Sequence, residues 1–122
     1  MEKKILIIED DNFLQGLEAK KLEDEGYKII TASTGEEALI KINEPSIDVI
    51  LLDLILPNFD GFEILKKIRE TKTLENIPII VFSNLSEEKA VQKSKELGAT
   101  DFMVKSNFTL DELVKRIKIV LK

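Results

Sequence analysis

Carboxylate, hydroxyl and ammonium side chains stand directly after short apolar runs at four places along the chain. The residues in these places are Glu9 with Asp10, Asp53, Ser83 and Lys105. Carboxylates held close together repel one another unless a cation lies between them. An aspartate can also act as a nucleophile and form an acyl phosphate when a metal and a fixed cation surround the transferring oxygens. These residue types are suited to metal-assisted phosphoryl transfer onto a carboxylate.

The composition narrows the kind of metal and mechanism that the chain could use. Among its 122 residues there is no cysteine and no histidine. Disulfides, thiolate sites, imidazole ligands and Ser-His-Asp catalysis are therefore excluded. A metal would have oxygen ligands only, which points to Mg²⁺, Mn²⁺ or Ca²⁺, and the small number of ligands on an open rim favours Mg²⁺. Glu9, Asp10 and Asp53 would together carry three negative charges, Lys105 one positive charge, and a divalent cation would bring the sum to zero.

Length and net charge indicate one acidic domain that spans residues 1–122. The 18 basic and 23 acidic residues give a net charge of −5 without a basic cluster, which argues against nucleic-acid or anionic-membrane partners. Apolar residues make up 43% of the chain, as expected for a folded domain. No targeting segment is recognisable and the longest apolar run is only strand-length, so we expect a cytoplasmic protein.

Each candidate residue also has an ordinary structural explanation. The acids at 9–11 could serve the start of a helix, with Asp11 as its N-cap. Asp53 could begin a turn, Ser83 could be a turn hydroxyl, and Lys105 could be a solvated strand-end lysine. Each of these explanations is plausible for its own residue. It is much less plausible that all of them hold at once and that the groups meet at the ends of neighbouring strands by chance.

Five short runs rich in isoleucine and valine predict the strands of a parallel sheet. These runs are Ile5–Ile8, Ile29–Ala32, Val49–Leu52, Ile79–Phe82 and Phe102–Val104. Most are continuous rather than alternating, which is typical of strands buried on both faces. Segments with helical spacing lie between them, and the spacing of apolar residues from Leu110 to Leu121 most clearly predicts a helix.

Capping signals divide the chain in the same way. Thr34 with Glu37 and Thr109 with Glu112 form capping boxes, and Asp60 with Glu63 is a similar pair. Gly26 and Gly98 stand where helices end in a left-handed residue. The resulting order is a strand and a helix repeated five times, which predicts an α/β fold with a doubly wound, open parallel sheet between two helical layers. The functional crevice of such a sheet lies at the carboxyl ends of its strands.

Four sequence blocks occur in order at intervals that are specific to one family. They are Ile7-Ile8-Glu9-Asp10, Asp53-Leu54-Ile55-Leu56-Pro57-Asn58-Phe59-Asp60-Gly61, residues Ile77–Ser83 and residues Gly98–Lys105. From Lys4 to Leu121 the chain resembles the receiver domain of bacterial two-component response regulators, of the chemotaxis-receiver type. The resemblance implies a flavodoxin-like, three-layer (βα)5 fold with strand order 2-1-3-4-5.

The resemblance also implies a role for each site residue. Asp53 would be the phosphoacceptor, and Asp10 and Asp53 would bind Mg²⁺ directly. Glu9 would act on the metal through water, and the backbone carbonyl of Ile55 would be a further ligand. Lys105 would pair with the phosphoryl group, and Ser83 would hydrogen-bond to one of its oxygens. Phe102 would be the aromatic rotamer switch beneath the last helices.

The implied activity is self-catalysed phosphorylation rather than turnover. A histidine kinase or phosphotransfer protein would donate the phosphoryl group. A downstream protein would bind the face formed by the fourth helix, the strand at 102–104 and the last helix, on a monomer or a phosphorylation-dependent dimer. The alternatives are an unphosphorylated binding module and a phosphatase with an aspartyl nucleophile. The phosphatase would need a second Asp where Ile55 stands. We expect a stand-alone receiver.

Two positions depart from the family pattern. The family usually has Lys-Pro with a cis peptide bond at the end of the fifth strand, whereas this chain has Lys105-Ser106. A cis bond before a residue other than proline costs about 2.5–4 kcal/mol, so we expect a trans bond. The residue after the switch hydroxyl is usually small, whereas here it is Asn84, whose side chain could narrow the path to Asp53 or add a hydrogen-bond donor.

Overall fold

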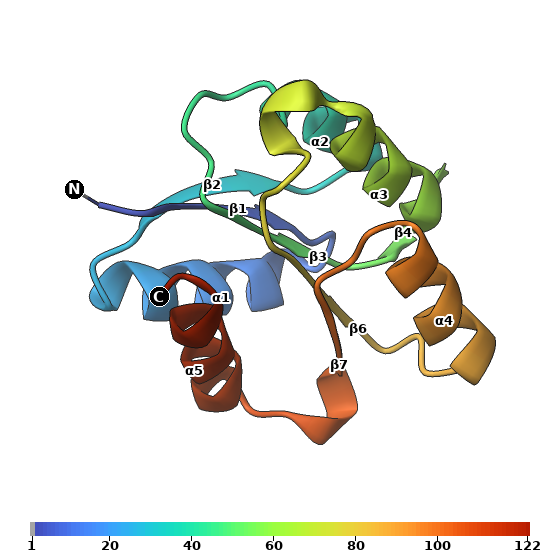
Figure 1. Cartoon of the computed structure of the whole chain (residues 1–122). Helices are drawn as coiled ribbons and strands as arrows, with labels where there is room; N and C mark the ends of the chain where they lie inside the picture. Colours follow the sequence, from blue (N-terminus) through green and yellow to red (C-terminus); the bar gives the residue numbers. More distant parts are fainter. Residues whose placement is uncertain (1) are drawn as a thin grey trace.

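A five-stranded parallel sheet forms the centre of the molecule (Figure 1). The computed structural model describes residues 2–122. The sheet strands are β1 (Lys4–Ile8), β2 (Lys28–Ala32), β3 (Val49–Leu52), β6 (Ile79–Ser83) and β7 (Asp101–Val104). They lie in the order β2-β1-β3-β6-β7, all parallel. The predicted fold and strand order are confirmed, and the strand ends differ from the prediction by at most one residue.

Helices cover both faces of the sheet and make the outer two layers (Figure 1). They are α1 (Asn12–Asp24), α2 (Gly35–Lys41), α3 (Gly61–Glu70), α4 (Glu88–Glu96) and α5 (Leu110–Val120), with 3-10 turns η1 (Lys72–Leu74) and η2 (Lys105–Asn107). Helices α1 and α5 pack together on one face, and α2 and α3 on the other. Helix α4 packs beside α3 and β7. Among residues 2–122, no helix has the length and apolar character to span a membrane.

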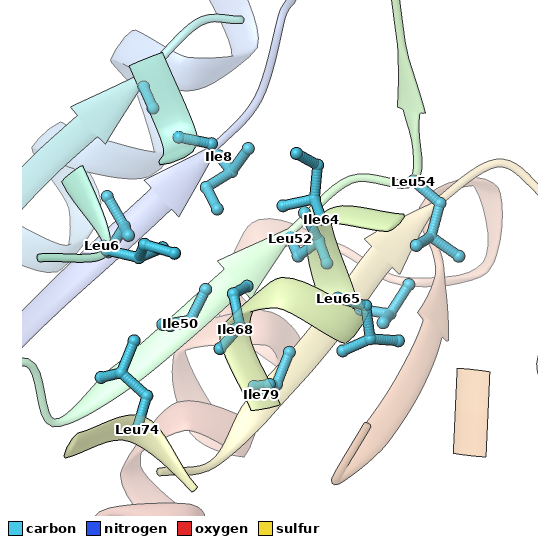
Figure 2. Packing of buried hydrophobic residues seen from close by; sticks show 14 of the residues in the cluster. Leu6, Ile8, Ile50, Leu52, Leu54, Ile64, Leu65, Ile68, Leu74 and Ile79 are labelled. Atoms are coloured by element: carbon cyan, nitrogen blue, oxygen red, sulfur yellow. The ribbon is translucent and has the colours of Figure 1, made fainter. Parts of the chain in front are cut away.

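The sheet separates two apolar cores. Alternate residues of each central strand point to opposite faces, so Leu6 and Ile8 enter one core while Ile5 and Ile7 enter the other. Figure 2 shows the first core, in which side chains of β1 and β3 face Ile64, Leu65 and Ile68 of α3. Strands β1, β3 and β6 are buried almost throughout, as predicted. The edge strands β2 and β7 are only partly buried.

The predicted helix caps are present, with two changes in detail, one of which is that Asp60 accepts from the N–H of Phe62 rather than from that of Glu63. Thr109 and Glu112 form a complete capping box. Thr34 accepts a hydrogen bond from the Glu37 N–H, but the Glu37 carboxylate accepts from the N–H of Ser33 rather than from that of Thr34. Gly26 and Gly98 have positive φ after α1 and α4, as predicted for helix C-termini. These caps set where each helix starts and stops relative to the strand before it.

A small hairpin between β3 and α3 was not predicted. Strands β4 (Ile55–Leu56) and β5 (Phe59–Asp60) pair antiparallel across a turn at Pro57-Asn58. Proline followed by a residue with positive φ, 63° at Asn58, is the arrangement of a type II turn. Helix α3 then starts at Gly61, where a Cβ would lie 2.2 Å from the Leu54 carbonyl oxygen. The hairpin therefore returns the chain tightly over the end of β3.

Candidate functional site

The Asp53 carboxylate is buried at the carboxyl end of β3 and is held by three hydrogen bonds. Ser83 Oγ donates to Oδ1 at 2.7 Å, and the Ile55 N–H donates to the same oxygen at 3.0 Å. Lys105 Nζ donates to Oδ2 at 2.6 Å. The residue is only 4% exposed. Its orientation is therefore set by groups from β6, from the turn that follows β3, and from the end of β7.

Three acidic side chains meet beside this position. One carboxylate oxygen from each of Glu9, Asp10 and Asp53 lies within 4.8 Å of the other two. Glu9 and Asp53 are buried and Asp10 is exposed. This donor set contains only hard oxygen atoms and is open to solvent at one residue, which fits Mg²⁺ or Mn²⁺ retaining part of its water shell. The predicted clustering of the acids is therefore confirmed.

Lys105 bridges two of these acids. Its Nζ lies 2.6 Å from Glu9 Oε1 and 2.6 Å from Asp53 Oδ2. Burial alone would lower the pKa of Lys105, but the hydrogen bonds that it donates to Asp53 and Glu9 outweigh burial, and the pKa is raised. For Glu9, burial is the largest influence and raises its pKa despite the hydrogen bond from Lys105. The ammonium is therefore firmly protonated at neutral pH.

The sheet register brings these residues together. Ile8 is level with Leu52, and Leu52 with Val81, so β1 and β3 end side by side and β6 runs two residues further, to Ser83. The backbone hydrogen bonding between strands extends to the site residues. The Asp53 N–H donates to the Ile8 carbonyl at 3.0 Å, and the Glu9 N–H donates to the Ala32 carbonyl at 3.0 Å. Strand β7 extends the sheet next to β6 and places Lys105 one residue after its end.

At the start of α1, the nearby acids Asp11 and Glu9 accept hydrogen bonds from different groups. Asp11 is the N-cap, as predicted, and accepts from the N–H groups of Phe13 and Leu14. Glu9 Oε2 accepts from the Asp11 N–H at 3.1 Å. Gln15 Nε2 donates to the carbonyls of Glu9 and Ala32 and to Ser33 Oγ, which ties the loops after β1 and β2 together. Sequence reasoning did not single out Gln15.

Phe102, Ile55 and Asn84 are the other residues singled out from the sequence. Phe102 is partly buried against the core shown in Figure 2, and its role as a switch stays a prediction. Ile55 is 51% exposed, and its carbonyl as a metal ligand also stays a prediction. The Lys105–Ser106 peptide is trans, as expected, and Lys105 reaches Asp53 with this geometry. Asn84 uses its side-chain oxygen, which accepts from the Ser106 N–H at 3.2 Å.

A buried acid behind the site was missed from the sequence. Glu18 on α1 is 2% exposed, and its Oε1 has no hydrogen-bond partner among the described residues. Burial, with repulsion from Glu9 and Asp53, raises the pKa of Glu18 to about 8. A signal was present, because Leu14, Glu18 and Leu22 recur at intervals of four and so share one helix face.

Comparison with known sequences identifies a family for nearly the whole chain. The model of the response regulator receiver domain matches residues 5–118. The alkaline phosphatase synthesis transcriptional regulatory protein PhoP of Bacillus subtilis is 40% identical over all of this chain and 50% of its own length. The transcriptional regulatory protein KdpE of Staphylococcus aureus is 41% identical over 98% of this chain and 50% of its own length. The chain spans about half the length of these curated relatives.

Solved structures that match this chain over nearly the whole length of both molecules point to the same family. Chemotaxis protein CheY4 of Vibrio cholerae matches with a TM-score of 0.92 and 31% identity, covering 99% of this chain and 100% of that one. The receiver domain of the Francisella response regulator 1452 matches with a TM-score of 0.87 and 32% identity, over 98% of this chain and 97% of that one. Likeness at this level extends to both the fold and the sequence.

Proposed function

The chain belongs to the response regulator receiver domain family, and on that premise we propose that Asp53 accepts a phosphoryl group from a histidine kinase or phosphotransfer protein. The observation that carries this proposal is the set of contacts at Asp53. A buried carboxylate lies between a hydroxyl donor from Ser83 and an ammonium donor from Lys105, next to two further acids. These are the groups that phosphoryl transfer to a carboxylate requires.

The proposed reaction exchanges one bond to phosphorus for another. An Asp53 carboxylate oxygen attacks the phosphorus of the donor's phosphohistidine, the new O–P bond forms, and the N–P bond breaks with its electron pair left on the donor imidazole. Magnesium, held by Asp10 and Asp53 directly and by Glu9 through water, would neutralise charge on the phosphoryl oxygens. Lys105 then pairs with one phosphoryl oxygen and Ser83 donates to another.

The proposed output is a change of surface rather than a product. Receiver domains act as phosphoacceptor switches, and here Ser83 and Phe102 would move together and repack the face formed by α4, β7 and α5. That face would bind a downstream protein or a second copy of the chain. The named relatives PhoP and KdpE are transcriptional regulators of about twice the length. We further propose that the protein acts in the cytoplasm.

The intact mass after incubation with acetyl phosphate tests the proposal. With Mg²⁺ the parent should gain one phosphoryl group, and Asp53→Asn should gain none. Chelation of the metal should also prevent the gain in the parent. Failure of the parent to form an adduct would instead support an unphosphorylated binding module, and continuous release of phosphate over many turnovers would support a phosphatase.

A further inference from the structure

A side chain continues the sheet beyond its last backbone pair. Strands β6 and β7 pair as far as Ser83 opposite Val104. Past that point the Ser106 N–H donates to Asn84 Oδ1 at 3.2 Å. The amide oxygen of Asn84 thus takes the place that a backbone carbonyl would have in the next rung. We call this hydrogen bond the Asn84–Ser106 latch.

The latch joins the two loops that hold Asp53. Asn84 directly follows Ser83, whose hydroxyl binds Asp53 Oδ1, and Ser106 directly follows Lys105, whose ammonium binds Asp53 Oδ2. Asn84, Lys105 and Ser106 also line one open surface pocket of about 320 Å³. At the end of η2, the N–H of Phe108 reaches the Lys105 carbonyl at 3.5 Å, so the turn that starts at Lys105 is closed by a long hydrogen bond.

The need for the latch is greatest during phosphoryl transfer. In the structure Lys105 is held by Glu9 and Asp53, each at 2.6 Å. When Asp53 bonds to phosphorus and a cation offsets the charge of Glu9, both of these attachments weaken. The direction of the Lys105 side chain then depends on its backbone, and the latch fixes the residue next to it.

We propose that Asn84 is a positioning residue, which holds the Lys105 loop against the Ser83 loop so that the ammonium meets the phosphoryl group. This inference rests on the proposed phosphorylation of Asp53. Asn84 does not itself contact the reacting atoms in this role. Its side-chain oxygen is the part that matters, and an aspartate at the same place would keep an acceptor for the Ser106 N–H.

Phosphorylation rates with acetyl phosphate and Mg²⁺ test the positioning role. Asn84→Ala should lower the maximal rate about three- to ten-fold, the factor in an equilibrium constant that one net hydrogen bond supplies. The acetyl phosphate concentration at half-maximal rate and the Mg²⁺ affinity should stay at parental values. Asn84→Asp should restore most of the rate. Ser86→Ala, an exposed change in the same loop, is the matched control and should behave as the parent.

A double-mutant cycle tests whether Asn84 acts through Ser106. Ser106→Pro removes the donor N–H, so in that variant Asn84→Ala should lower the rate no further, whatever rate the family-like Lys-Pro bond itself gives. A loss from Asn84→Ala that is as large in the Ser106→Pro variant as in the parent would overturn the proposal. An Asn84→Ala protein that is phosphorylated at the parental rate would overturn it as well.

Hydrogen exchange separates failure of the latch from failure of the proposed function. In the unphosphorylated protein the Ser106 amide should exchange several-fold faster in Asn84→Ala than in the parent. Unchanged exchange would overturn the latch, whatever happens at Asp53. If the parent takes up no phosphoryl group, the proposed function fails, while the exchange of the Ser106 amide still decides whether the latch exists.

Discussion

Asp10 and Asp53 carry the same carboxylate but have different surroundings. We therefore expect Asp10 to contribute to metal binding but little to the stability of the fold. Asp53 is buried among three hydrogen-bond donors, whereas Asp10 is exposed at the rim of the acidic cluster. An exposed carboxylate contributes little to the free energy of unfolding. We expect Asp10→Asn to abolish Mg²⁺-dependent phosphorylation and not to lower that free energy, because the change also removes repulsion from Glu9 and Asp53.

Mass spectrometry after acetyl phosphate treatment and a denaturant titration check both parts of this prediction. Asp24→Asn, a similarly exposed change at the far end of α1, serves as the control and should be phosphorylated normally. If Asp10→Asn were phosphorylated as readily as the parent, the assignment of Asp10 to the metal would be wrong.

Glu18 makes the stability of the fold depend on pH. Its pKa is about 8 in the folded protein, above the ordinary value of 4.5 expected on unfolding, so the folded state binds the extra proton between these two values. The free energy of unfolding should therefore fall as pH rises from 4.5 to about 8 and level off above that. Below this range the residue is protonated in both states and contributes no pH dependence.

Replacement of Glu18 by leucine should remove this loss of stability at higher pH. Glu18→Leu joins Leu14 and Leu22 on an apolar helix face and should raise the free energy of unfolding by roughly 2–4 kcal/mol at about pH 8, with a smaller gain at about pH 5. Glu23→Gln, exposed on the same helix, should show no such change with pH. Denaturant titrations at several pH values give the answer, and equal gains at both ends of the range would contradict the assigned titration.

At the scale of elements, one arginine connects three segments of backbone. Arg69 on α3 donates from Nε to the Gly98 carbonyl at 2.9 Å, and from Nη1 to the carbonyls of Leu74 at 2.8 Å and Ile77 at 2.6 Å. Its side chain packs so closely on Gly98 that a Cβ there would lie 2.8 Å from it. Burial lowers the pKa of Arg69. The guanidinium joins the end of α3, the approach to β6 and the end of α4.

Loss of the Arg69 hydrogen bonds should destabilise the protein more than loss of a surface charge. Arg69→Met leaves the carbonyls of Gly98 and Ile77 without their donor, whereas the Leu74 carbonyl still accepts from the Ile77 N–H. Unsatisfied buried groups cost about 1–3 kcal/mol each. We expect a loss of roughly 2–4 kcal/mol in the free energy of unfolding, because water reaches some of these carbonyls in the variant. Lys66→Met on the exposed side of α3 should change it by less than about 0.5 kcal/mol. Equal effects of the two changes would refute the role of Arg69.

The elements that could be predicted from the sequence are those whose signal is local. Apolar runs predicted the five sheet strands within one residue, and side-chain caps such as Thr109 predicted the helix starts. The hairpin of β4 and β5 was missed because two-residue strands have no periodicity to detect. Its only sequence signs are Pro57-Asn58, which suits the turn, and Gly61, whose need for close approach to Leu54 appears only once the chain is folded.

At the scale of the whole molecule, a phosphoryl group at Asp53 should be sensed on one face. Beryllium fluoride with Mg²⁺ is a suitable mimic of that group. Amide exchange with and without it should change along α4, β7 and α5, because we propose that Ser83 and Phe102 move with the phosphoryl group. The Asp53→Asn protein should show no change. Differences confined to α1 would contradict the proposed output face.

The candidate site was predicted as a set of residues, and its internal contacts were not. Doubly wound topology alone places Glu9, Asp53 and Lys105 at one edge of the sheet, so their meeting follows from strand order. Which oxygen of Asp53 binds Ser83 and which binds Lys105 depends on loop geometry. The burial of Glu18 and the latch at Asn84 likewise arise from packing between segments distant in the sequence.

The ammonium of Lys105 between Glu9 and Asp53 means that the resting domain carries its own counterion. Two buried acids already share the positive charge of Lys105, so folding should not require a metal, unlike in domains that unfold when their ion is removed. A chelator should therefore leave the midpoint of thermal unfolding unchanged, and added Mg²⁺ should raise it only by mass action. The domain should therefore stay folded when the Mg²⁺ concentration changes, and only the extent of its phosphorylation should vary.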